Sequence, residues 1–268
     1  MTTGTIDSTP LHGLRVLITR PTQQQAVLCQ AITRLGGVPV SLPLIAISPR
    51  EEDAAQKILR SQVQALDNYR LLIFVSTNAA RFGAELIDEY WPQFPVGVEV
   101  MAIGPTTAAE LRQRLDCPVT HAESGMDSEA ILDLPQLQRV AGERIAIFRG
   151  QGGRELLAAT LRERGARVDY IEVYTRHPAP QDPGRLGELL QDPGLDVVTV
   201  TSAEALPHLL TLAGEHRERL GLLPLVVPSA RVADLASAAG FARVIDAGGA
   251  NEAALVRALQ EIAAGAKT

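Results

Sequence analysis

The chain has 268 residues, of which 46% are hydrophobic and 21% charged, and its formal net charge is −6. This composition is typical of a globular protein with an aliphatic core and excludes a disordered chain. The acidic balance argues against a general nucleic-acid binder, which needs a basic surface.

Targeting and metal-binding signals are weak in this sequence. The longest apolar runs, such as Leu71–Val75, fall far short of the roughly 18 residues that a membrane span needs. The polar start Met1–His12 lacks the apolar centre of a secretory signal. Cys29 and Cys117 have no metal or redox spacing and are interpreted as small core residues, and the histidines form no ligand pair. We therefore expect a cytoplasmic protein without a metal, a membrane or a nucleic-acid partner.

The N-terminal part predicts one strand–helix unit followed by an extended segment. Leu14–Thr19 predicts a buried parallel strand, and Thr22–Leu35 predicts an amphipathic helix that a pair of glycines ends. The segment Val38–Ile47 contains Pro39 and Pro43, which suit an edge strand or a connector rather than a central strand.

Helices and strands alternate in the next part of the chain, which implies a parallel sheet covered on both faces. Ser76-Thr77-Asn78 ends one strand and can cap the helix that follows it. After the lead-in Ser124–Asp127 comes a short last helix. The predicted elements are the helix Glu51–Asp67, the strand Leu71–Val75, the helix Ala79–Tyr90, the strand Val98–Ile103, the helix Ala108–Leu115 and the helix Ser128–Leu134.

The pattern then restarts at Gly142 with the strand Arg144–Phe148, a helix Arg154–Arg164 and the extended segment Val168–Arg176. The same spacing separates Gly13 from Gly142, Arg20 from Arg149, Gly36 from Gly165, and, with small shifts, Phe74–Ala79 from Val200–Ala205 and Ser128–Leu132 from Asn251–Leu255. Any two α/β segments share apolar strands and glycine-ended helices, but several pairs in one order favour a duplicated domain.

The two extended segments predict where the chain passes between its domains. We expect residues 1–39 with 177–268 to form one α/β domain and residues 48–168 to form the other. Residues 40–47 and 169–176 would be the linker strands, and the cleft between the domains would be the active site. Tyr174 would lie at its edge, where the repeat has Ile45. It is either a packed strand aromatic or a weak acid that donates a hydrogen bond.

Polar residues gather where the predicted strands end, which is where parallel sheets bind ligands. Hydroxyl groups and backbone N–H groups at helix starts bind anions, and guanidinium groups pair with carboxylates. Each serine or threonine is also explained as a helix cap. The candidate residues for a multiply anionic ligand are Arg20, Ser76, Thr107, Arg149, Ser202, Ser229 and Arg231.

The segment Arg149–Arg154 follows a strand and resembles the start of a dinucleotide-binding loop. Glu155 stands where that pattern has its last glycine, and a carboxylate there would repel a pyrophosphate. We therefore reject nucleotide binding, and no spacing in the chain suggests a catalytic triad.

Taken together, these motifs resemble the uroporphyrinogen-III synthase family over nearly the whole chain. The matching segments are residues 16–21 (VLITRP), 74–79 (FVSTNA), 103–108 (IGPTTA), 149–157 (RGQGGRELL), 173–176 (VYTR), 200–206 (VTSAEAL) and 227–233 (VPSARVA). The resemblance implies an α/β fold of two flavodoxin-like parallel-sheet domains joined by a two-stranded β linker. It also implies a monomeric lyase of porphyrin, tetrapyrrole and haem biosynthesis that uses no cofactor.

The substrate implied by the resemblance is hydroxymethylbilane, closed to uroporphyrinogen III with inversion of ring D and loss of water. Delivery by the preceding pathway enzyme is an open alternative to free diffusion. Tyr174 matches the family tyrosine that assists departure of the hydroxyl group, and Thr107 and Ser202 match polar positions involved in binding. Val227–Arg231 departs from the corresponding first-half motif, which leaves the roles of Ser229 and Arg231 open. The alternatives are a two-lobed non-enzymatic binder of small molecules and a flavodoxin-like electron carrier.

Overall fold

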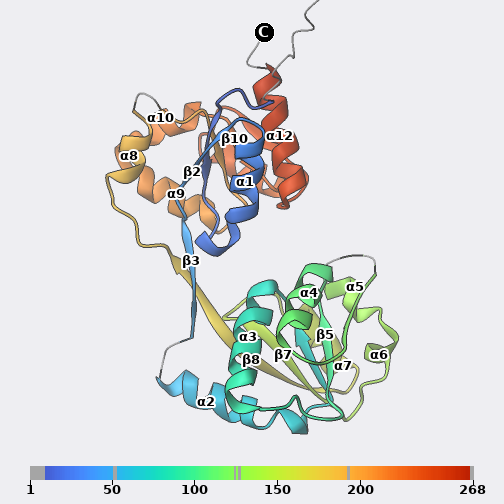
Figure 1. Cartoon of the computed structure of the whole chain (residues 1–268). Coiled ribbons are helices and arrows are strands. Elements are labelled where there is room, and N and C mark those ends of the chain that lie inside the picture. The colour runs from blue at the N-terminus through green and yellow to red at the C-terminus, as the bar shows by residue number, and fades with distance from the viewer. Residues whose placement is uncertain (1–9, 51–52, 124, 126–127, 192–193, 266–268) are drawn as a thin grey trace, which may run out of the picture. The chain divides into compact units, whose positions relative to one another are not determined.

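The computed structural model describes residues 10–50, 53–123, 125, 128–191 and 194–265, and Figure 1 shows its helices and strands. The chain divides into two compact units. Unit 1 consists of Met1–Ala46 with His177–Thr268, and unit 2 consists of Ile47–Arg176. The predicted polar start before Pro10, the first residues of the helix predicted from Glu51 and most of the lead-in Ser124–Asp127 lie outside the described residues.

Unit 1 is built on a five-stranded parallel sheet. From edge to edge its strands are β11 (Val244–Asp246), β10 (Leu225–Val227), β9 (Val197–Thr199), β1 (Arg15–Ile18) and β2 (Val38–Ser41). Pro39 lies in β2, at the edge of the sheet, as its missing N–H group predicts.

Helices cover the sheet of unit 1, and α1 and α12 lie side by side in Figure 1. Leu28 and Ile32 of α1 share a buried core with Leu255 and Leu259 of α12. The helical segments are η1 (Thr22–Gln24), α1 (Ala26–Arg34), α8 (Arg185–Leu189), α9 (Ala205–Ala213), η3 (Gly214–His216), α10 (Arg217–Leu222), α11 (Ala230–Ala238) and α12 (Glu252–Gly265).

Unit 2 is built on a six-stranded sheet. From edge to edge its strands are β3 (Ile45–Pro49), β8 (Arg167–Pro178), β7 (Arg144–Gly150), β4 (Leu71–Phe74), β5 (Glu99–Ala102) and β6 (Val119–His121). The last five are parallel to one another. Its helical segments are α2 (Asp53–Gln64), η2 (Leu66–Asn68), α3 (Thr77–Tyr90), α4 (Pro105–Arg114), α5 (Ser128–Leu132), α6 (Pro135–Gln138) and α7 (Leu156–Glu163).

The two sheets share one strand order, because β8-β7-β4-β5-β6 in unit 2 corresponds to β2-β1-β9-β10-β11 in unit 1. In unit 1 the first strand lies between the second and the third, which is the flavodoxin-like order, and in unit 2 β7 takes the place of β1. The predicted class, two flavodoxin-like parallel-sheet domains, is therefore confirmed, while the two-stranded linker stays a prediction. In such sheets ligands bind beyond the carboxyl ends of the strands where the order reverses. In unit 2 this point lies between β7 and β4.

Two phenylalanine rings fix the register of β7 and β4 just before the strands end. Phe74 and Phe148 are register partners, and their fully buried rings stack with centroids 4.3 Å apart. The residues that follow Phe74 and Phe148 therefore start from fixed and neighbouring positions.

The structure differs from the prediction in several local features. The predicted helix Thr22–Leu35 is a 3-10 turn followed by α1, and the predicted extended segment Val38–Ile47 is split between β2 and β3 in different sheets. The short strands β6 and β11 were missed, because three residues carry too little alternation to be recognised. Within the described part of the chain, no helix is long and apolar enough to cross a membrane.

Candidate active site in unit 2

A cavity of about 620 Å³ lies beyond the carboxyl ends of β7 and β4. It is therefore at the place where a sheet of this topology binds ligands. Its lining consists of Val75, Ser76, Ile103, Ser128, Ile147, Arg149, Gly150, Gly152, Gly153, Arg154, Leu157, Ala158, Tyr170, Tyr174 and Arg176.

Tyr174 reaches this cavity because of a bulge in β8. Arg149 is the register partner of Glu172, but Gly150 is the partner of Tyr174, so Val173 is one extra residue on β8. The consecutive residues Val173 and Tyr174 are both buried, whereas side chains of a regular strand point alternately to opposite faces of the sheet. The Tyr174 ring lies against Gly150, where an added Cβ atom would be only 2.5 Å from Cε2. The bulge and the missing side chain together fix the ring.

Ser76 supplies the partner of the Tyr174 phenol. Its Oγ lies 3.2 Å from the phenol oxygen and also accepts a hydrogen bond of 3.0 Å from the backbone N–H of Ala79. Ser76 is thus the N-cap of α3, which confirms the capping predicted for this strand end. The cap holds the hydroxyl beside the phenol, at the positive end of the α3 dipole.

Arg149 is the second-last residue of β7, and its side chain, which contacts the loop between β7 and α7, is only 5% exposed. Nη1 pairs with Glu155 Oε1 at 3.1 Å, while Nε donates to the Gly150 carbonyl and Nη2 to that of Gly152. Its guanidinium carbon stands 4.4 Å from the ring centroid of Tyr170. Each of the three guanidinium nitrogens therefore has a partner within unit 2.

Tyr170 completes this cluster from β8. Its phenol donates a hydrogen bond to Glu155 Oε2. This bond lowers the pKa of the Glu155 carboxyl, with burial opposing it and Arg149 adding to the effect. Burial and then the Glu155 carboxylate raise the pKa of the Tyr170 phenol. The sequence analysis did not select Tyr170 or Glu155, because the cluster depends on pairing between β7 and β8.

The charge of the cavity lining has one sign. Among the described residues that line it, Arg149, Arg154 and Arg176 are basic and none is a carboxylate. This occurs in a chain of net charge −6. A positive lining favours a ligand that carries carboxylates.

Thr107, predicted as a binding residue, is 4% exposed within α4 and does not line this cavity. Its predicted role stays a prediction.

The remaining predicted binding residues belong to unit 1. Arg20 is half-buried, and burial lowers its pKa while the Glu252 carboxylate opposes this shift. Ser202 accepts a hydrogen bond of 3.3 Å from the Ala205 N–H. Ser229 is the N-cap residue of α11 without a side-chain cap bond, and Arg231 is exposed on that helix. Their predicted role in binding stays a prediction.

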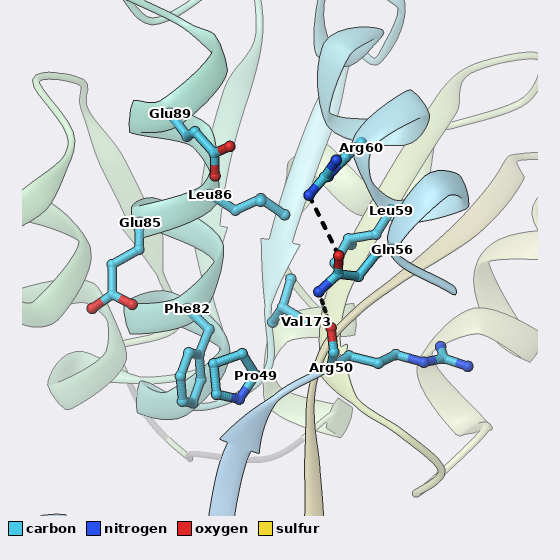
Figure 2. A pocket seen from close by; sticks show the side chains of 10 residues that line it. All are labelled: Pro49, Arg50, Gln56, Leu59, Arg60, Phe82, Glu85, Leu86, Glu89 and Val173. Atoms are coloured by element: carbon cyan, nitrogen blue, oxygen red, sulfur yellow. Dashed lines mark hydrogen bonds between the residues drawn. The ribbon is translucent and has the colours of Figure 1, made fainter. Parts of the chain in front are cut away.

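A second hollow of unit 2, about 240 Å³ in volume, lies between α2, α3, the end of β3 and Val173 of β8 (Figure 2). Its lining carries both signs of charge, with Arg50 and Arg60 opposite Glu85 and Glu89. Figure 2 shows Arg60 bonded to Gln56, which in turn bonds to the Arg50 carbonyl. Acidic side chains in the wall make it a poor receptor for a polyanion.

The described residues contain no cluster of histidine, cysteine, aspartate or glutamate that could hold a metal ion. Cys29 and Cys117 are free and half-buried, and Cys29 packs against the hydrophobic core of unit 1. Burial raises the pKa of both thiols, that of Cys117 to about 11, so neither is primed as a nucleophile.

The sequence was compared with proteins of known family. The family described as uroporphyrinogen-III synthase HemD matches residues 26–257. The chain is 35% identical over 252 residues to uroporphyrinogen-III synthase of Escherichia coli (strain K12), which covers 92% of this chain and 100% of the relative. It is 34% identical over 249 residues to the enzyme of Salmonella typhimurium, with 92% and 100% covered.

Solved structures with the same fold carry the same family name. A mutant uroporphyrinogen III synthase of Thermus thermophilus superposes with a TM-score of 0.54 at 21% identity, covering 92% of this chain and 99% of that one. The protein of Helicobacter pylori 26695 has a TM-score of 0.57 at 15% identity, with 92% and 99% covered. At these identities the structures support the fold, while the sequence matches over most of the chain support the family. The chain therefore belongs to the uroporphyrinogen-III synthase family.

Proposed function

We propose that this protein is a uroporphyrinogen-III synthase, a lyase that cyclises hydroxymethylbilane to uroporphyrinogen III with inversion of ring D and loss of water. Family membership supports this assignment. The observation that points to a particular site for the reaction is the cavity beside Tyr174. The described lining of this cavity includes three arginines and no carboxylate, and Glu155 pairs with Arg149. Arg154 and Arg176 thus keep the lining basic, which suits a linear tetrapyrrole that carries carboxylates on its rings.

In the proposed reaction, the Tyr174 phenol donates a proton to the terminal hydroxyl group of the bilane as it leaves as water. The phenol is buried and is held 3.2 Å from Ser76, so its oxygen has a fixed direction. The Ser76 hydroxyl can then donate to the phenolate oxygen, because its own oxygen accepts from Ala79 N–H and leaves its proton available. The N-terminus of α3 favours the negative charge that forms there.

The remaining steps depend on how the chain is held. The azafulvene cation on ring A is attacked by the substituted carbon of ring D, and the spiro intermediate fragments and recloses with ring D turned over. The unassisted bilane closes without inversion, so the protein must bring the substituted carbon to the cation first. The cationic lining of the cavity would supply part of this grip. The reaction requires no metal or cofactor, and we propose a monomer that acts in the cytoplasm.

The test is an isomer assay. Purified protein is mixed with hydroxymethylbilane, and the products are oxidised and separated into isomers I and III. The proposal expects isomer III to dominate, whereas a non-enzymatic binder would leave the mixture equal to the protein-free control. A mixture no richer in isomer III than that control would contradict the proposed function.

A further inference from the structure

The loop between β7 and α7, residues Gly150–Glu155, is built around the buried side chain of Arg149. Each of the three guanidinium nitrogens donates to this loop: Nε to the Gly150 carbonyl, Nη2 to the Gly152 carbonyl and Nη1 to Glu155. Gly150, Gly152 and Glu155 are thus all bonded to the same guanidinium group, which fixes their positions.

A second set of contacts holds the guanidinium group of Arg149 and its partner Glu155. The Tyr170 ring lies under the guanidinium group, and its phenol bonds to the other oxygen of Glu155. Both carboxylate oxygens of Glu155 are therefore occupied. Gly153 has a φ of +110°, and a Cβ atom there would lie 2.8 Å from Arg149 Nη2. The close approach requires glycine at this position.

These contacts leave Arg149 badly suited to bind a substrate carboxylate. Its charge is already balanced by Glu155 at 3.1 Å, and a ligand would have to displace that partner or a backbone carbonyl. Arg149 is buried while the Glu155 side chain is 63% exposed, so a ligand that displaced Glu155 would have to replace the counter-ion of a buried guanidinium group.

Arg154 has the opposite properties. It follows Gly153 and precedes Glu155, so the contacts that the loop makes with Arg149 fix the backbone on both sides of Arg154. Its side chain is exposed and lines the cavity, and among the described residues no hydrogen bond or ion pair occupies it. A guanidinium group in this state can pair with a carboxylate at no cost to an existing partner.

We propose that Arg154 pairs with a carboxylate of the substrate in this cavity, and that Arg149 is a positioning residue that folds the loop presenting Arg154. The inference rests on the proposed function and adds to it which cation meets the bilane. It also replaces the substrate-binding role that the sequence predicted for Arg149 with a positioning role.

The first test compares the kinetics of Arg154→Gln, Arg154→Lys and the control Arg139→Gln, an exposed arginine of the same unit outside the cavity. Arg154→Gln is expected to raise KM for hydroxymethylbilane about tenfold with little change in kcat, as loss of a charged hydrogen bond implies. Arg154→Lys should recover part of the loss, and added salt should raise KM less in Arg154→Gln than in the wild type. A KM equal to that of Arg139→Gln would overturn the proposal.

The second test separates the two roles of Arg149 by the sign of one change. Glu155→Gln loosens the loop, so KM should rise if Arg149 is a positioning residue. The double variant Glu155→Gln/Arg154→Gln should then have the same KM as Arg154→Gln alone. If Arg149 itself bound the substrate, removing its competing carboxylate would lower KM. The positioning role would be contradicted if Glu155→Gln lowered KM. It would also be contradicted if Glu155→Gln raised KM by the same factor in the wild type and in Arg154→Gln. An inactive wild type would instead contradict the proposed function, and with it the inference.

Discussion

The phenol oxygen of Tyr174 lies 3.2 Å from the hydroxyl oxygen of Ser76, so a hydrogen bond joins β8 to the N-cap residue of α3. The same serine oxygen accepts the N–H of Ala79. A helix cap, which is a common structural device, thereby orients the one phenol that we propose as a proton donor. Three of the predictions below follow from this arrangement.

Tyr174→Phe removes the proton donor and keeps the ring against Gly150. We expect kcat for formation of isomer III to fall about 10²-fold or more, with little change in KM, because the hydroxyl group acts on the leaving group. Steady-state kinetics with separation of the isomers measures this change. Full activity of the variant would remove Tyr174 from the chemistry.

Ser76→Ala removes both the cap of α3 and the partner of the phenol. We expect the free energy of unfolding to fall by about 1 kcal/mol and kcat to fall as well. In the Tyr174→Phe background, the same substitution should lower stability but not kcat, because the phenol it acts on is gone.

The matched control is Asn251→Ala, since Asn251 Oδ1 accepts from the Ala254 N–H at 2.9 Å at the start of α12, a helix of unit 1. Urea unfolding should show a similar loss of stability without loss of kcat. If both variants kept full activity, Ser76 would act only as a cap.

Gly150→Ala places a methyl group where the Tyr174 ring lies, 2.5 Å from Cε2 and 2.6 Å from Cζ. The ring must move, so we expect kcat to fall strongly and the free energy of unfolding to fall by about 1–3 kcal/mol. Gly184→Ala is the control, because the nearest atom to its added Cβ is 3.5 Å away. Equal activities of the two variants would show that the ring position does not matter.

Tyr69 links stability to alkaline pH. Burial first, and then its 2.8 Å bond to Asp169, raise the pKa of the Tyr69 phenol to about 12. Above the ordinary pKa of about 10, the unfolded chain loses this proton before the folded protein does. The contribution of Tyr69 is therefore complete below pH 10 and declines as the pH rises toward 12.

Tyr69→Phe should lower the free energy of unfolding by about 1 kcal/mol at neutral pH. Denaturant unfolding at about pH 8 and about pH 10.5, on either side of the ordinary phenol pKa, should then show a smaller alkaline loss in the variant than in the wild type. Parallel pH profiles would indicate that Tyr69 titrates alike in the folded and unfolded states.

Features with a local cause were predictable from the sequence. Ser76-Thr77-Asn78 after an apolar run indicates a helix cap, and the glycine at Gly165, with a φ of +87°, indicates the end of α7. The repeated order of such signals was enough to predict two parallel-sheet units.

Features that depend on pairing between strands were not predictable. The extra residue Val173 is visible only when β8 is aligned with β7, and without it the phenol would not stand beside Gly150. The contacts of Arg149 likewise include Tyr170, a residue of the neighbouring strand, so they could not be anticipated from Arg149 and its sequence neighbours. The binding role predicted for Arg149 from its place at a strand end stays a prediction, and the positioning role is our proposal.

The insertion of unit 2 within unit 1 has a consequence for how the protein forms during translation. The central strands β1 and β9 are hydrogen-bonded neighbours, yet Thr19 and its partner Thr199 are 180 positions apart in the chain. The ribosome therefore releases β1 and β2 long before β9 exists, and completes all the residues of unit 2 in between. The edge of β1 that pairs with β9 stays unpaired until then, so the unit whose synthesis begins first is the one that can finish folding only last.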